Sequence, residues 1–476
     1  MSGHARNWLC LLLAVSVARL NGCAGSQPIS DPLAVLRSLD ATPGRQLAAM
    51  EALDQDGASE PYITVLRGMV HLPGYTVGVR EAAVQRLIRT DLDGLKQTIE
   101  LRLPMLSALQ WRRRLCAIIA EQGWIDLSPT LARAWATPIG AWADDEFDRP
   151  EYLALAQLHG KDDVLNEIFA IFLESSGAAR QGLRSRCWSL LMRLGQRNRL
   201  RELIAGGQFN TGDSMLEDLQ AALNELGILP SNVEEILWLR RLRQKEFSAF
   251  WSQARQAMSH LDPQIADTLE LRSLPVIVAA WLHEPAVLGL TRQQLFDEVD
   301  AALRDHKRHE VSFEGFPGDY SQNLRGQRDE ITWGDLAAIR MAIRFCGVPQ
   351  VVEHLFDYAE RDRLDTTSEL GGLVRLDEKN RFEIVEFQPR VRYHDNRFDA
   401  PQAMFDAGYT ALFHFHLHAQ QHDNHRYAGP HLGDLDYAQN TRANCLVFTF
   451  VNEDTLNVDF YRHGRVMVDL GEIHRR

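Results

Sequence analysis

The chain has 476 residues, of which 45% are hydrophobic and 24% are charged. This is the composition of a globular protein of two or three domains, and it excludes a largely disordered or collagen-like chain. The formal net charge of −13 argues against a nucleic-acid partner, because contact with phosphates needs a basic face. Beyond the N-terminal residues, no segment has the ~20 apolar residues of a membrane-spanning helix.

The first 22 residues have the pattern of an export signal. Arg6 supplies a positive start, and the apolar run from Trp8 to Ala18 is short for a transmembrane helix. The next residues, Leu20 to Cys23, resemble a bacterial lipobox, in which the cysteine is lipidated and becomes the new N-terminus. The resemblance implies a tether over residues 23–32 and a lipid anchor that holds the exported protein to a membrane of the cell envelope. An ordinary cleaved signal and an uncleaved anchor are the alternatives.

Four further cysteines would remain in the mature protein. No CxxC spacing is present, which argues against a zinc site built from cysteines. Cysteines of an exported protein can form disulfides, here in any of three pairings. Their apolar sequence surroundings favour buried free thiols instead. These residues are Cys116, Cys187, Cys346 and Cys445.

Residues 33–307 are predicted to be helical throughout, because apolar residues recur at helical spacing. Similar pairs of short helices recur with spacings of 33, 38 and 35 residues, anchored at Ala82, Leu115, Leu153 and Trp188. This period resembles HEAT-like α-solenoid repeats, which implies a docking surface for a protein partner or substrate. An irregular helical domain that only positions the C-terminal half is the alternative. The basic run Arg112–Arg114 indicates a solvated helix face.

The pattern changes after a linker predicted over residues 308–330. Within residues 331–476, two helices joined near Gly347 and Pro349 are followed by segments of strand character. The continuous apolar run over 446–451 predicts a strand buried on both faces, and a hairpin is predicted to turn at His463 and Gly464. The predicted fold class is therefore an all-α N-terminal domain followed by an α+β domain.

Histidines gather in this second half: six of the 17 fall between His414 and His431. Side chains alternate along a strand, so the segment 411–417 places His414 and His416 on one face. Two imidazoles one pleat apart can chelate one cation, and a catalytic zinc ion usually takes three protein ligands. The nearest acidic candidates for the third ligand are Asp434 and Asp436.

An ordered set of residues resembles the JAMM/MPN metallopeptidases, also called JAB domains. The segment Ser368–Val374 resembles the family's glutamate signature and contains Glu369. His414 and His416, and then Asp434, follow in the order of that family's histidine pair and aspartate. The resemblance covers residues 349–471.

The resemblance implies that His414, His416 and Asp434 bind one zinc ion and that Glu369 acts as general base toward the attacking water. The family reaction is the hydrolysis of a peptide or isopeptide amide bond, so the expected partner is a protein or peptide substrate. His431 stands where the family has a serine that stabilises the oxyanion. A protonated His431 would donate that hydrogen bond instead.

Two other functions remain open at this stage. A catalytically silent MPN-type scaffold in protein assembly would explain the replaced serine. A metal-storage or metal-sensing lipoprotein would use His418, His422 and His425 as a metal-binding tract. These three residues lie between His416 and Asp434, in a segment four residues longer than the usual 13 of the family.

Overall fold

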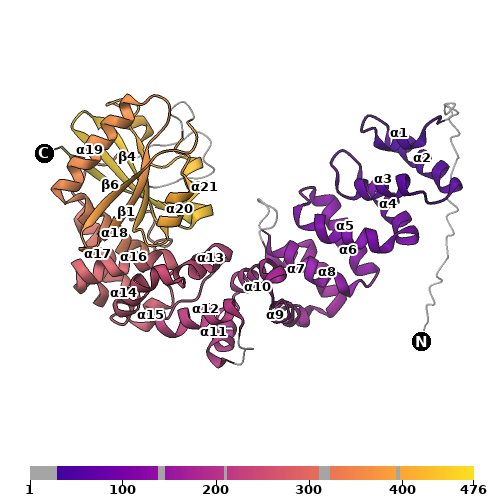
Figure 1. Ribbon diagram of the computed structural model, residues 1–476, viewed down its shortest axis with the longest axis horizontal. Helices are drawn as coiled ribbons and strands as arrows, with labels where there is room; N and C mark the ends of the chain where they lie inside the picture. The colour runs from indigo at the N-terminus through magenta and orange to yellow at the C-terminus, as the bar shows by residue number, and fades with distance from the viewer. Residues whose placement is uncertain (1–28, 138–144, 208–211, 310–321, 393–396, 476) are drawn as a thin grey trace, which may run out of the picture. The chain divides into compact units, whose positions relative to one another are not determined.

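The computed structural model describes residues 29–475 except 138–144, 208–211, 310–321 and 393–396. It confirms the predicted fold class, because helices make up the N-terminal part and a six-stranded sheet with helices follows (Figure 1). The predicted signal and Cys23 lie outside the described residues. Among the described helices, none combines the length and the apolar character that crossing a bilayer requires.

The chain divides into two compact units, residues 1–122 and residues 123–476. The helices of the first unit are α1 (Pro32–Arg37), α2 (Pro43–Asp56), α3 (Glu60–His71), α4 (Val77–Thr90), α5 (Leu92–Arg102) and α6 (Leu109–Glu121). The second unit begins with α7 (Ser128–Ala136), α8 (Pro150–His159), α9 (Val164–Glu174), α10 (Gln181–Arg193), α11 (Arg197–Gly206), α12 (Ser214–Ala221), α13 (Val233–Leu242), α14 (Ser248–Met258), α15 (Pro263–Ala266), α16 (Leu274–His283) and α17 (Arg292–Leu303).

Only two of the four predicted repeat anchors are buried. Leu115 and Trp188 are buried, but Leu153 is 51% exposed, and its neighbours Tyr152 and Leu155 fill the core from α8 instead. The helical spacing therefore predicted the position of this helix correctly, but it predicted the wrong face to be buried. The HEAT-like resemblance itself stays a prediction.

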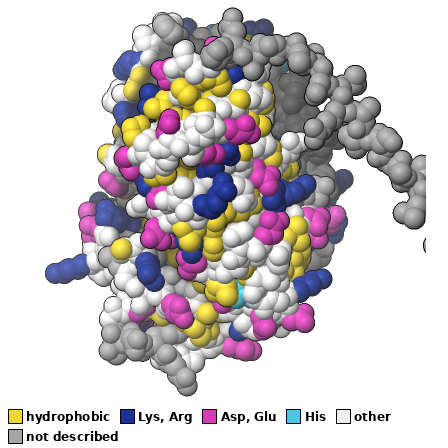
Figure 2. Space-filling view, turned by 90° about the vertical axis from the view of Figure 1, so that its right-hand side faces the viewer, with side chains coloured by type: hydrophobic (Ala, Val, Ile, Leu, Met, Phe, Trp, Pro, Cys, Tyr) yellow, Lys and Arg dark blue, Asp and Glu magenta, His cyan; other side chains and the backbone are white. Residues whose placement is uncertain are grey.

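The basic run on α6 does not form a binding patch. Arg112 is fully buried and donates to the Leu106 carbonyl at 3.0 Å. Arg114 forms ion pairs with Glu81 and Glu121. On the face of the molecule in Figure 2, Lys and Arg side chains are interspersed with Asp and Glu side chains. One of the three arginines is thus a buried structural residue, which the prediction of a solvated face did not anticipate.

The second unit ends in the α+β part. Its helices are α18 (Trp333–Cys346), α19 (Pro349–Leu364), α20 (Gln402–Gly408) and α21 (Leu432–Thr441). Its strands are β1 (Gly371–Leu376), β2 (Phe382–Phe387), β3 (Phe413–His418), β4 (Cys445–Asn452), β5 (Thr455–Arg462) and β6 (Val466–His474). The sheet order is β2-β1-β3-β4-β5-β6, and only β3 and β4 pair in parallel among these strands. The strands and the hairpin predicted over 446–470 are confirmed.

Strands β3 and β4 are parallel neighbours, so the chain between them must cross over, and helix α21 forms this connection. The helix lies on the sheet face that carries His414, whose ring contacts Tyr437 of α21. Helix α19 covers the opposite face, where Tyr358 contacts Phe415. The central strands β3 and β4 are therefore buried on both sides, as the continuous apolar run over 446–451 predicted for β4.

Two adjacent glycines allow β1 to fit between its neighbours. A Cβ atom on Gly371 would lie 2.6 Å from the Phe415 carbonyl oxygen, and one on Gly372 would lie 2.1 Å from that of Val385. Both distances are far below van der Waals contact, so only glycine permits this approach of β1 to β3 and β2.

The four cysteines outside the N-terminal segment are free. Cys116, Cys187 and Cys445 are buried and Cys346 is partly buried. Burial raises the pKa of Cys187 and Cys346 to about 12, so these thiols are unreactive at neutral pH. The prediction of buried thiols is confirmed.

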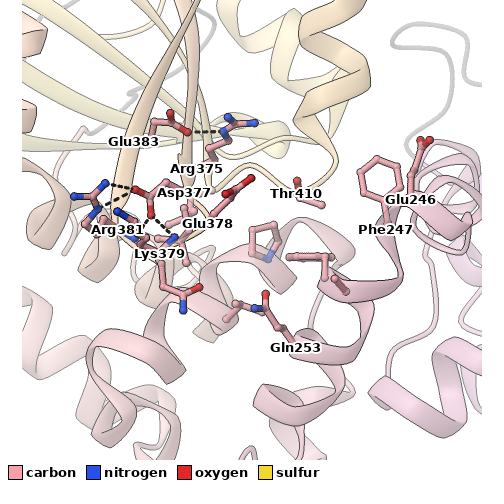
Figure 3. Close-up of a pocket in the computed structure, with 17 residues that line it drawn as sticks. Glu246, Phe247, Gln253, Arg375, Asp377, Glu378, Lys379, Arg381, Glu383 and Thr410 are labelled. Carbon is pink, nitrogen blue, oxygen red and sulfur yellow. Dashed lines mark hydrogen bonds and ion pairs between the residues drawn. The ribbon is translucent and has the colours of Figure 1, made fainter.

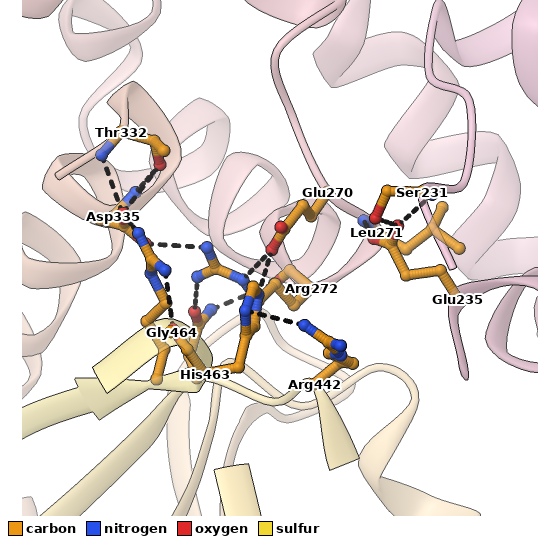
Figure 4. A network of polar contacts seen from close by, with 12 residues as sticks. Ser231, Glu235, Glu270, Leu271, Arg272, Thr332, Asp335, Arg442, His463 and Gly464 are labelled. Carbon is orange, nitrogen blue, oxygen red and sulfur yellow. Dashed lines mark hydrogen bonds and ion pairs between the residues drawn. The ribbon is translucent and has the colours of Figure 1, made fainter. Parts of the chain in front are cut away.

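A buried ionic network joins the helices before residues 308–330 to the sheet after them (Figure 4). The linker over residues 308–330 stays a prediction. Asp335 of α18 is fully buried and accepts from Arg272 at 2.8 Å and from Arg462 of β5 at 2.9 Å. Glu270 pairs with both Arg272 and His463, at 2.5 and 2.7 Å. Burial alone would raise the pKa of Asp335, but the two guanidinium groups outweigh it and lower that pKa to about 2.

We predict that Asp335→Ala destabilises the protein by about 3–5 kcal/mol, because two buried guanidinium groups would lose their shared counter-charge. Urea unfolding followed by circular dichroism measures the change. The matched control is Asp300→Ala, which removes a surface pair with the exposed Arg325 and is expected to cost no more than about 1 kcal/mol. Equal losses in the two variants would contradict the structural role of the network.

Candidate metal centre

The pairing of β1 with β3 positions Glu369. Gly371 lies opposite His416, and the Leu417 N–H donates to the Leu370 carbonyl at 3.0 Å, so the antiparallel ladder continues beyond the end of β1. Continued by two residues, this register places Glu369 opposite His418. The Glu369 side chain is only 7% exposed. The sheet thus fixes an acidic side chain beside the last histidine of β3.

Strand β3 carries three buried histidines on one face, because every second side chain points the same way. His414 and His416 are each 6% exposed and His418 is 2% exposed. The alternate residues Phe413, Phe415 and Leu417 fill the core on the other face. The prediction of a shared face for His414 and His416 is confirmed, and the strand extends one pleat further, to His418.

Helix α21 supplies the carboxylate. Its first turn contains Asp434, whose Oδ2 accepts from the His431 N–H at 2.7 Å in a capping box. The other oxygen of Asp434 lies 3.4 Å from His416 Nε2, and Oδ2 lies 3.9 Å from His418 Nε2. A carboxylate in the first helical turn is also favoured by the helix dipole. The alternative candidate Asp436 is exposed on the same helix.

These side chains form two overlapping groups that are able to hold a metal ion. One is Glu369, His416 and His418, and the other is His418, His431 and Asp434. The ligand atoms within each group lie within 4.8 Å of one another. His418 belongs to both groups and is therefore their centre.

The donor set fits a zinc ion. His418 Nδ1 lies 2.8 Å from the Tyr427 carbonyl, which can only accept, so this nitrogen carries the proton and Nε2 keeps its lone pair. Nε2 of His418 lies 3.1 Å from Nε2 of His416. Two atoms bound to one tetrahedral zinc ion are about 3.3–3.4 Å apart, given bonds of about 2.0–2.1 Å. The spacings among His416, His418 and Asp434 scatter around this value.

Burial and charge act on these residues in opposite directions. Burial lowers the pKa of His418 to about 3, aided by His416, so its ring is neutral at physiological pH. Burial also lowers the pKa of His416, but Asp434 outweighs it and the net shift is upward. Asp434 has its pKa lowered in turn, because His416 outweighs the effect of burial. A neutral imidazole beside an ionised carboxylate is the protonation state that a zinc site needs.

His414 belongs to neither group, although the sequence predicted that it binds the metal together with His416. Its Nδ1 lies 2.7 Å from the Tyr437 hydroxyl, and its Nε2 faces Gly408 at the end of α20. The reason is the course of α21, which returns along β3: Asp434 reaches His416 and His418, and the next helical turn meets His414. Burial lowers the pKa of His414 to about 4.

His418 is the residue that sequence reasoning missed. The sequence analysis groups it with His422 and His425 in the long segment before Asp434. The alternation of apolar residues and histidines continues to His418, and this was the available signal. Its neighbours His422 and His425 do lie outside the cluster and pair with Glu360 and Asp423, respectively.

His431 stacks on His418 with ring centroids 4.9 Å apart. Burial lowers its pKa, which favours the neutral ring over the protonated one expected from the sequence. A neutral imidazole still carries one N–H that can donate. His431 therefore lies beside His418, where it is able either to donate a hydrogen bond or to bind a metal.

A cavity of about 320 Å³ opens beside the cluster and includes Glu369, His418 and His431 in its wall. Gln420 Nε2 donates to Glu369 Oε1 at 3.3 Å, and Asn424 Nδ2 donates to Gln420 Oε1 at 2.6 Å. These amides orient the carboxylate from the cavity side.

A second cavity, of about 720 Å³, lies at the other end of β1, between α14, α16 and the β1–β2 hairpin (Figure 3). Its charged side chains pair with each other, as Arg375 does with Glu383 and Arg381 does with Asp377. It brings no metal-binding group together within the described residues. The smaller cavity is therefore the better candidate for chemistry.

Comparison with protein-family models, with curated proteins and with solved structures found no match to the chain.

We predict that His418→Gln weakens the binding of added zinc by at least ~100-fold, because His418 belongs to both groups. Loss of a residue that only hydrogen-bonds a metal ligand typically costs ~10–100-fold in affinity, and loss of a ligand should cost more. His414→Gln, in the same strand, is the matched variant and is expected to change affinity by less than ~10-fold. Competition with a chromophoric chelator measures both. A larger loss of zinc affinity in His414→Gln than in His418→Gln would contradict this assignment and favour His414 and His416 as the ligands, as the sequence predicted.

Proposed function

We propose that the chain binds one zinc ion through His416, His418 and Asp434 and hydrolyses a peptide or isopeptide amide bond. The observation that carries the proposal is the convergence of buried ligand atoms from β3 and α21 with the Glu369 carboxylate. Burial of so many ionisable groups is costly unless they pair or bind a metal, and a metal ion would compensate all of them at once.

When bound, the zinc would supply Lewis acidity to the amide carbonyl and to the attacking water. Glu369 would take the proton of that water and pass it to the leaving amine. Gln420 supports this role, since its N–H donates to Glu369 Oε1 at 3.3 Å and orients the carboxylate toward the cavity. His431, in the wall of the same cavity, would donate its N–H to the developing oxyanion.

The order of Glu369, two histidines and Asp434 along the chain supports the JAMM-like resemblance. The one change is in which two histidines form the pair. His416 and His418 replace His414 and His416, and the interval to Asp434 becomes two residues shorter and closer to that of the family. On the lipobox resemblance, we further propose that the enzyme is exported and held at a membrane by Cys23. The helices of the N-terminal part would dock the substrate or a protein partner.

We predict that Glu369→Gln retains one zinc ion per chain but lowers amide hydrolysis by about 10²–10⁴-fold, the usual contribution of a general base. The measurement combines zinc analysis with cleavage of a panel of quenched peptide and isopeptide substrates. Glu360→Gln is the matched control, because Glu360 pairs with His422 outside the cluster. Unchanged turnover in Glu369→Gln would remove this residue from its proposed role, and a wild-type chain without zinc would contradict the proposal as a whole.

A further inference from the structure

The cavity beside the histidine–carboxylate cluster is also polar at the lining residues outside that cluster. Its wall there contains the side-chain amides of Gln420, Gln421 and Asn424 and the ring of Tyr427. No aliphatic side chain contributes to its described lining. An apolar substrate group would find little to pack against in this cavity, whereas a polar or charged group would find hydrogen-bonding partners.

Arg426 provides the positive charge of this wall. It is the one Lys or Arg side chain in the described lining, and it is exposed to the cavity and to solvent. Its guanidinium group lies over the Tyr427 ring, with the carbon Cζ 4.7 Å from the ring centroid. Stacking of this kind orients an arginine and leaves its in-plane N–H donors available.

The carboxylates of the cavity wall and of the segment around Arg426 have other partners. Asp423 lies 2.5 Å from His425 Nδ1, and Glu360 pairs with His422 at 2.7 Å. Glu369, across the cavity, receives the Gln420 amide and faces the histidines. Within the described part of the chain, no carboxylate lies within ion-pair distance of Arg426.

We propose that Arg426 binds a free carboxylate that the substrate carries close to the scissile amide. A guanidinium group with oriented donors matches a carboxylate, which it can bind through two parallel hydrogen bonds. The inference rests on the proposed hydrolase function and specifies its substrate class. The carboxylate belongs either to an acidic side chain or to the C-terminus of a peptide.

The test uses the zinc-loaded full chain with Glu369→Gln, which is expected to bind substrate without turnover. Three short N-acetylated peptides are titrated by calorimetry: one with glutamate and an amidated C-terminus, one with glutamine in its place, and the glutamine peptide with a free C-terminus. At least one anionic peptide should bind about tenfold or more tightly than the neutral one, as a charge-assisted hydrogen bond predicts. Which of the two binds identifies the source of the carboxylate.

Adding Arg426→Gln should abolish this preference, while Arg426→Lys should retain part of it. Lys379→Gln, at the distant β1–β2 turn, is the matched control that also removes one positive charge. This variant should retain the full preference for the anionic peptide. Equal binding of the three peptides would overturn the proposal. So would a preference that survives Arg426→Gln, because the metal would then bind the carboxylate. Zinc content, measured on the same samples, reports separately on the proposed function, and a zinc-free chain is titrated with the same peptides as a test of Arg426 alone.

Discussion

The parallel pairing of β3 with β4 is the constraint on which the rest of the site depends. Parallel neighbours cannot be joined by a tight turn, so the chain must leave the carboxyl end of β3 and return through a helix. That helix, α21, begins beside His418 and runs back along the strand. Its first turn therefore brings Asp434 to the histidines, and its dipole favours the negative charge there. A slip of one residue in β3 would turn all three histidines to the opposite face.

The close approach of β1 to β3 adds the second carboxylate. Gly371 and Gly372 remove the Cβ atoms that would hold the strands apart, and Glu369 precedes them directly. The site thus combines groups from β3, from the first turn of α21 and from the segment directly before β1. The buried network around Asp335 joins strand β5 of the same sheet to the preceding helices, within the unit of residues 123–476.

Much of this arrangement could be predicted from the sequence, because strand alternation and the order of Glu369, the histidines and Asp434 are local patterns. Which two of the histidines bind the metal could not be predicted from the sequence. Side chains alternate along a strand, so three histidines share one face of β3, and only the course of α21 selects among them. The contact between the helical part and the sheet could not be predicted for a similar reason. Arg272 and Arg462 look like surface charges in the sequence, yet they are 3% and 8% exposed and join the two halves.

The most direct test of the account is a crystal structure of the zinc-loaded protein with anomalous diffraction recorded on both sides of the zinc absorption edge. The account predicts one anomalous peak, about 2.0–2.1 Å from Nε2 of His416, from Nε2 of His418 and from a carboxylate oxygen of Asp434. A peak at His422 and His425, or one bound by His414 in place of His418, would contradict it.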